Sequence, residues 1–220
     1  MSTFKAPLPE AKVGIFGFSR DCFMKDRAIV RTGRLAGVCE KIGERISICP
    51  VVIENEDDVL TAETWAVAEG INAAVIYLAN FGPEGPASIF AKWFQKYCGP
   101  VMVCAAAESS KEDLINGRGD AFCGGLSFCF NTDRIKAKCH LPWNFVDSPE
   151  GLAPAIAHFR KVARVLIGLS SLKVIAFGPR PEDFIACVYN LETVLGFDIR
   201  VMENSELDLA QMYRARPGDN

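Results

Sequence analysis

The chain has 220 residues, of which 50% are hydrophobic and 23% charged, and its formal net charge is −3. This composition is typical of a soluble globular protein, and the acidic balance argues against a nucleic-acid surface, which needs clustered Lys and Arg. No run approaches the roughly 18 consecutive apolar residues of a membrane span, and Pro7 and Pro9 interrupt the apolar stretch that a signal peptide would need.

Short apolar runs alternate with longer amphipathic segments over the first half of the chain, which is the pattern of parallel βαβ units. The runs are continuous rather than alternating, as expected for strands with helices on both faces. Pro50 falls near the middle of the second run and predicts a sheet edge or an early strand end. The expected strands are residues 12–18, 46–53, 72–79 and 100–107, and the expected helices are residues 27–44, 55–70 and 84–99.

After Ala107 the sequence becomes polar, then rich in glycine and aromatic residues. Ser148 is suited to cap a long helix, but Pro154 lacks a backbone donor, so regular helix is expected only from Ala153. The elements expected here are a helix near residues 120–132, a fifth strand at 135–142, a helix at 148–169, strands at 172–177 and 197–202, and helices at 181–196 and 204–213.

The nine cysteines form no C-x-x-C pair, and several lie in apolar runs, where a thiol behaves as a small hydrophobe. Cys123, Cys129, Cys139 and His140 come closest to a cluster, but they lack the short paired spacings of a zinc site. We therefore expect reduced thiols, no metal ligands in this chain, and a cytoplasmic protein.

Motifs for several common chemistries are missing. No G-x-G-x-x-G follows the first strand, and the chain has neither a Walker A nor a G-x-S-x-G motif, so a dinucleotide cofactor and a serine hydrolase are unsupported. Of the two histidines, His158 is expected to be a structural residue of an amphipathic helix. His140 ends a strand, where we favour a structural role over a ligand contact.

The turns after parallel strands are the usual ligand-binding positions of such a sheet. Arg20 and Arg180 are the cations in these turns, and each could contact a ligand. Each could equally be a solvated turn residue or an ion-pair partner, and Arg180 has Glu182 and Asp183 nearby for this purpose.

Three segments carry a resemblance to a known family. They read GLSFCFNTDRIKAKCHLPWNF, ARVLIGLSSLKVIAFGPRPEDFIAC and GFDIRVMENSELDLAQMY. Together they resemble the N-terminal half of the L-fucose isomerase-related family, with L-arabinose isomerase as a more distant relative. The similarity runs from about Lys12 to Tyr213 and is most specific over residues 168–209.

The resemblance implies an aldose–ketose isomerase with two Rossmann-like α/β domains and a β-rich third domain, assembled as a trimer or hexamer. It implies Mn²⁺ held by a glutamate, an aspartate and a histidine from later segments, which have no counterpart in these residues. It also implies that the first domain lends substrate contacts to a neighbouring subunit. Arg20 matches the lent arginine, and Phe81 is the aromatic residue available to stack on the sugar.

The resemblance favours a first Rossmann-like domain at residues 1–168 and an incomplete second α/β domain at 169–220, which would expose an apolar patch. The pattern alone leaves open that the last two strands join the first sheet as one domain.

We expect the N-terminal portion of a Mn²⁺-dependent ketol isomerase that works through an enediol, is inactive alone, and acts on a small sugar such as L-fucose or L-arabinose. The alternatives are a free-standing sugar- or anion-binding module without catalysis, and an interaction protein without a ligand.

Overall fold

The computed structural model describes residues 9–117, 119–180 and 182–215. The described residues fall into two compact units, residues 9–164 and residues 165–215, and the division lies shortly before the domain boundary expected at residue 168. In these ranges no helix has the length and apolar character to cross a bilayer.

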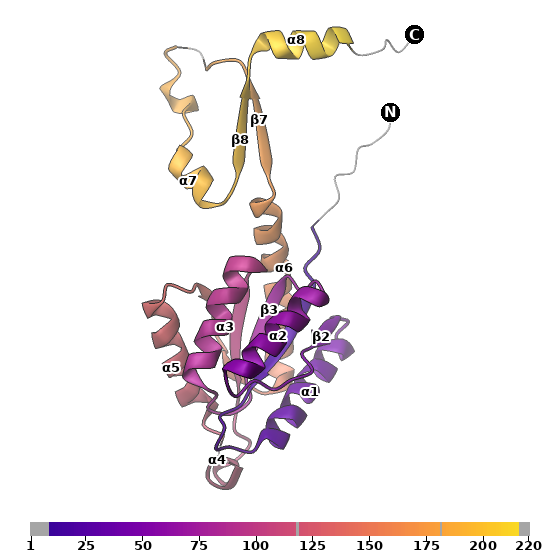
Figure 1. Cartoon of the computed structure of the whole chain (residues 1–220), viewed down its shortest axis with the longest axis vertical. Coiled ribbons are helices and arrows are strands. Elements are labelled where there is room, and N and C mark those ends of the chain that lie inside the picture. The colour runs from indigo at the N-terminus through magenta and orange to yellow at the C-terminus, as the bar shows by residue number, and fades with distance from the viewer. Residues whose placement is uncertain (1–8, 118, 181, 216–220) are drawn as a thin grey trace. The chain divides into compact units, whose positions relative to one another are not determined.

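The first unit is a parallel sheet with helices on both faces, which confirms the Rossmann-like α/β prediction (Figure 1). The strand order is β2-β1-β3-β4-β5, with β6 paired to β4. The strands are β1 (Val13–Phe18), β2 (Ile46–Ile48), β3 (Ala73–Leu78), β4 (Val101–Ala106), β5 (Cys139–His140) and β6 (Val146–Asp147). The helices are α1 (Lys25–Lys41), α2 (Glu56–Ala68), α3 (Glu84–Tyr97), α4 (Lys111–Gly117), α5 (Ala121–Arg134) and α6 (Pro149–Ser170).

The core lies on both sides of β1 and β3, whose residues are all buried. On the α2–α3 face, the fully buried rings of Phe16 and Phe90 lie 4.5 Å apart, and Phe94 packs against both. On the other face Gly17 leaves room for Thr32, whose hydroxyl would overlap any Cβ there. An ion pair between Arg34 and Glu150 joins α1 to α6 on this face, and Arg160 of α6 pairs with Glu44 in the turn after α1.

The strand β2 is both short and at the sheet edge. Pro50 cannot donate a ladder hydrogen bond, and regular pairing ends at Ile48, as its position predicted.

The opposite edge differs from the expected single strand at residues 135–142. Only Cys139 and His140 pair with the start of β4, and pairing resumes at Val146 and Asp147 near its end. Residues 141–144 leave the ladder between these two pieces, and the Phe145 carbonyl accepts from Ala105 N at 2.7 Å. Pro142, which has no N–H to donate, lies in that excursion.

The long helix α6 begins at Pro149 rather than at Ala153 as expected. Its first turn is held by Ser148, whose carbonyl accepts from Leu152 N at 2.9 Å and whose hydroxyl accepts from Gly151 N at 3.2 Å. Pro154 is therefore tolerated inside the helix, because the bonds around it fix the first turn.

The second unit contains a separate two-stranded parallel sheet, so its strands do not extend the main sheet. Its elements are β7 (Lys173–Phe177), the 3₁₀ turn η1 (Ile185–Cys187), α7 (Leu191–Gly196), β8 (Arg200–Asn204) and α8 (Glu206–Ala215). None of the described residues from 165 to 215 is buried.

The prediction of a single helix at residues 181–196 is wrong over residues 182–196, which the structure describes. The backbone at Val188 is extended, with φ −80° and ψ 119°, which ends the 3₁₀ turn. Asn190 then starts α7 by accepting a hydrogen bond from Thr193 N at 2.9 Å. This Asn cap begins a new helix, and the apolar periodicity used for the prediction did not indicate a helix start at this position.

Candidate substrate-binding site

The strand order reverses between β1 and β3. The chain leaves β1 for β2 on one side, whereas β3 pairs with β1 on the other. The carboxyl ends of two strands at such a reversal border a crevice where open α/β sheets bind ligands. Two turns lie there: residues 19–24 after β1 and residues 79–83 after β3.

Asn80 joins these two turns. Its Oδ1 accepts from Arg20 N at 2.9 Å and from Gly82 N at 3.1 Å, and its Nδ2 donates to Ser19 Oγ at 2.9 Å. Asn80 is only 4% exposed and Ser19 is fully buried. Because buried hydrogen bonds are costly to leave unmade, this amide fixes the position of Arg20 relative to the turn after β3.

Arg20 and Phe81 meet across the two turns. The Arg20 guanidinium carbon lies 4.9 Å from the centroid of the Phe81 ring, and Phe23 packs edge-on against the same ring at 6.5 Å. The structure thus brings two of the residues singled out in the sequence into one contact, which offers guanidinium donors beside an aromatic surface.

Gly124 sets the place of Phe81 from the other side. A Cβ at Gly124 would overlap the Phe81 carbonyl. Glycine at this position therefore lets α5 approach the turn more closely than a residue with a side chain would allow.

Arg31 and Glu108 continue the polar edge toward β4. Arg31 Nη1 donates to the Ala79 carbonyl at 2.6 Å, and its Nη2 donates to Glu108 Oε2 at 3.1 Å. Both side chains are largely buried, at 15% and 20% exposure, which strengthens this charge-assisted pair. Oε1 of Glu108 is buried without a hydrogen-bond partner among the described residues.

A recess of about 520 Å³ adjoins Arg20. Glu54 at its wall pairs with Lys25 at 2.8 Å, and this hydrogen bond raises the pKa of Lys25. Carboxylates outnumber the arginine in the lining, so the recess favours hydroxyl donors over an anionic ligand. Its lining residues are Arg20, Asp21, Glu54, Asn55, Glu56, Pro83, Glu84 and Pro86.

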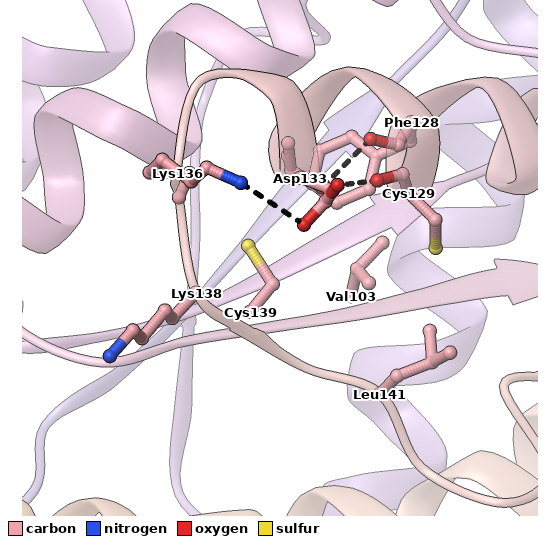
Figure 2. A pocket seen from close by; sticks show the side chains of 10 residues that line it. Val103, Phe128, Cys129, Asp133, Lys136, Lys138, Cys139 and Leu141 are labelled. Atoms are coloured by element: carbon pink, nitrogen blue, oxygen red, sulfur yellow. Dashed lines mark hydrogen bonds and ion pairs between the residues drawn. The ribbon is translucent and has the colours of Figure 1, made fainter.

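A second hollow, of about 420 Å³, lies between α5 and the strands β4 and β5 (Figure 2). Burial raises the pKa of the Cys139 thiol to about 12, so this thiol is protonated near neutral pH and supplies no nucleophile. Lys136 and Asp133 point toward each other at the rim, 3.8 Å apart. We assign this hollow no chemistry.

Comparison with protein-family models matches residues 14–170 to a model described as fucose/sulfoquinovose isomerase, N-terminal domain. The chain belongs to the fucose/sulfoquinovose isomerase family. The match covers the main sheet except Val13, and all of α6, and it confirms the resemblance to the N-terminal part of this family. A search of curated proteins found no match.

The fucose isomerase resemblance implied a Mn²⁺ ion, and the described residues do not fit one. Nowhere in residues 9–117, 119–180 and 182–215 do three or more His, Cys, Asp or Glu side chains gather so that they could hold a metal. We therefore assign no step of an isomerisation to a metal held by these residues.

Arg180, the third residue singled out for this isomerase-family chain, lies in the second unit, whereas Arg20 and Phe81 lie in the first. Its Nη1 donates to the Glu182 carbonyl at 3.4 Å. It borders a recess of about 880 Å³ whose wall includes Tyr189 and Glu203, joined by a 3.0 Å hydrogen bond.

Sequence reasoning expected ligand-binding turns after the strands, which include Asn80 and Glu108, but it singled out neither residue, and it missed Arg31. A polar residue directly after a buried strand, as in LANF, is a signal that could have identified Asn80. Arg31 lies within a helix, and only the packing of α1 on the sheet brings it to the Ala79 carbonyl.

Proposed function

We propose that this chain supplies a sugar-binding edge of an aldose–ketose isomerase acting on a small neutral sugar such as L-fucose or L-arabinose. The observation that carries the proposal is the Arg20–Phe81 contact at the strand reversal of a domain matched to this isomerase family. The guanidinium donates to sugar oxygens, the ring covers an apolar sugar face, and the nearby carboxylates accept from hydroxyls.

In this proposal, residues other than those described supply the ligands of the Mn²⁺ ion. They also supply the groups that move a proton through an enediol. When bound, the ion would polarise the sugar carbonyl. In this proposal the described residues bind and orient the sugar, and we expect the 220-residue chain to be inactive alone.

We further propose that the chain works in a homo-oligomer, a trimer or hexamer, in which Arg20 and Phe81 complete the site of a neighbouring subunit. The exposed apolar side chains of residues 165–215 support an assembly, because such surfaces usually face a partner. A cytoplasmic location fits the nine cysteines, all of which are free thiols.

The test is an NMR titration of the full chain with L-fucose and L-arabinose, followed through backbone amide shifts. We expect shifts at residues 19–21 and 79–82, with a dissociation constant of about 1 mM or weaker, because the chain provides only part of a site. Arg20→Ala should remove these shifts. Shifts confined to other regions, or conversion of L-fucose to its ketose by the chain with Mn²⁺, would contradict the proposal.

A sugar-binding module without catalysis is the second candidate, and the lack of a metal-binding cluster among the described residues favours it. A complete binding site gives a tighter complex than half of a shared site. Calorimetry without metal separates the two, since a module binds one sugar with a dissociation constant of about 10 μM or lower.

A further inference from the structure

A different recess, of about 670 Å³, lies beside the interrupted edge strand of the main sheet. Residues 141–144 leave the ladder between β5 and β6 and line this recess together with residues of α6. Interruptions of an edge strand often re-aim side chains next to functional sites. The recess is lined by His140, Leu141, Pro142, Trp143, Asn144, Asp147, Gly151, Pro154, Ala155 and His158, none of which borders the recess at Arg20.

Trp143 borders this recess and is 95% exposed. A tryptophan side chain is rarely this exposed to solvent, because its ring is among the largest apolar surfaces of any side chain. Trp65 and Trp93, by contrast, pack against the phenylalanine rings of the core. Trp143 therefore provides a flat apolar surface to anything that enters the recess.

Asn144 provides an unused acceptor in the same wall. Its Nδ2 donates to Asp147 Oδ2 at 2.9 Å and to the Gly151 carbonyl at 3.0 Å. Both partners are acceptors, so the amide orientation is fixed and Oδ1 faces away from them. Asn144 Oδ1 is buried and has no hydrogen-bond partner among the described residues, so a hydroxyl group that reached it would make a bond that these residues leave unmade.

Asp147 is a second acceptor held in place. Its Oδ1 accepts from Ser148 N at 2.7 Å, and the hydrogen bonds from Asn144 and Ser148 lower its pKa. The carboxylate rests against Gly151, where a Cβ would overlap it. The recess therefore presents an ionised carboxylate whose position is determined by its neighbours.

His140 adds no fixed positive charge to the recess near neutral pH. His140 stacks on Phe159, with ring centroids 5.8 Å apart and planes 11° apart. Burial, followed by repulsion from His158, lowers the pKa of His140, so its imidazole is neutral near pH 7. An anionic ligand would meet the Asp147 carboxylate, and no Lys or Arg lies in the lining to offset it.

We propose that this recess is a second carbohydrate site, which binds a neutral monosaccharide with an apolar ring face on Trp143 and hydroxyl groups donating to Asn144 Oδ1 and Asp147. A monosaccharide combines an apolar C–H face with several hydroxyl donors, which this wall can satisfy together. The site shares no residue with the Arg20–Phe81 edge and does not depend on the isomerase proposal.

The experiment is a fluorescence titration of the full chain with L-fucose, paired with calorimetry. We expect a saturable change in tryptophan emission. Trp143→Phe should remove the emission change, Trp143→Ala should weaken calorimetric binding by about tenfold or more, and Asn144→Leu should weaken it by about tenfold. Trp93→Phe serves as the matched control and should keep the emission change.

Arg20→Ala separates this site from the proposed isomerase edge and should leave the emission change intact. An emission change that survives Trp143→Phe, that Arg20→Ala removes, or that is absent altogether would overturn the proposal. Adenosine quenching more strongly than L-fucose would overturn the assignment to a sugar. Trp143 is almost fully exposed, so an unchanged unfolding temperature in its variants will show that the fold is intact.

Discussion

The guanidinium of Arg20 lies over the ring of Phe81, 4.9 Å from its centroid, where the strand order of the sheet reverses. The two residues are far apart in the sequence, and the Asn80 amide between them bonds to the backbone of both turns. This contact links the fold to the proposed sugar-binding edge, and it can be changed by single substitutions.

Replacing Phe81 tests the contact directly. Phe81→Leu removes the ring proposed to cover the sugar and the contact that holds Arg20, so we expect it to weaken sugar binding about two- to fivefold. Phe81→Trp is the matched control, and it should bind at least as well as the wild type because tryptophan is the better partner for a cation. The NMR titration with L-fucose measures both. Equal affinities for the leucine and tryptophan variants would contradict a role for the ring.

Asn80 is expected to be a stability residue as well as a positioning one. Asn80→Ala leaves two backbone donors and the Ser19 hydroxyl without their partner, and we expect a loss of about 2–4 kcal/mol in the free energy of unfolding. Urea unfolding followed by tryptophan fluorescence reports on the first unit, which contains all three tryptophans. The exposed helix cap Asn55→Ala should cost only about 1 kcal/mol. A similar loss for both variants would show that burial of Asn80 has no special effect.

The two glycines Gly124 and Gly37 should respond in opposite directions to the same change. Gly124→Ala places a Cβ on the Phe81 carbonyl, so it should destabilise the first unit and alter the amide shift of Phe81. Gly37 lies inside α1, and apart from its neighbours in the helix no atom lies within 4 Å of the position that an added methyl group would take, so Gly37→Ala should stabilise by about 0.5–1 kcal/mol. Thermal unfolding and an NMR spectrum of each variant check this; stabilisation by Gly124→Ala would be the contrary result.

His140 is expected to make stability depend on pH. Its pKa is lowered in the folded chain, so below an unfolded value of about 6.5 the unfolded state binds more protons and stability falls as the pH drops. His140→Phe keeps a ring against Phe159 but cannot be protonated. The free energy of unfolding in urea should depend less steeply on pH for this variant. The measurement runs from about pH 7.5 to about pH 5, which brackets the ordinary histidine pKa. An unchanged slope would assign the dependence to other groups.

Much of the main sheet could be predicted from the sequence, because its strands are buried on both faces and appear as continuous apolar runs. The strands at Val13–Phe18, Ala73–Leu78 and Val101–Ala106 lie within the expected ranges. The interruption of the edge strand at residues 139–147 could not be predicted, because it depends on which residues of β4 this segment pairs with.

The candidate site was only partly predictable, for a related reason. Arg20 and Phe81 stood out because charged and aromatic residues follow the ends of two strands. Their contact required the order of the strands, which apolar periodicity does not contain. Trp143 and Asn144 were part of a segment that carried the family resemblance, but their shared recess with α6 appears only when the edge strand is folded.

The described residues from 165 to 215 include no buried side chain, and this has a consequence for hydrogen exchange. The β7–β8 ladder has no core beneath it, so in a monomeric chain its amide hydrogens should exchange through local opening, with little free energy required. Amides of β3, buried along their whole length, should exchange only when the first unit unfolds. Slow exchange in both ladders would therefore be a direct sign that another polypeptide covers the second unit.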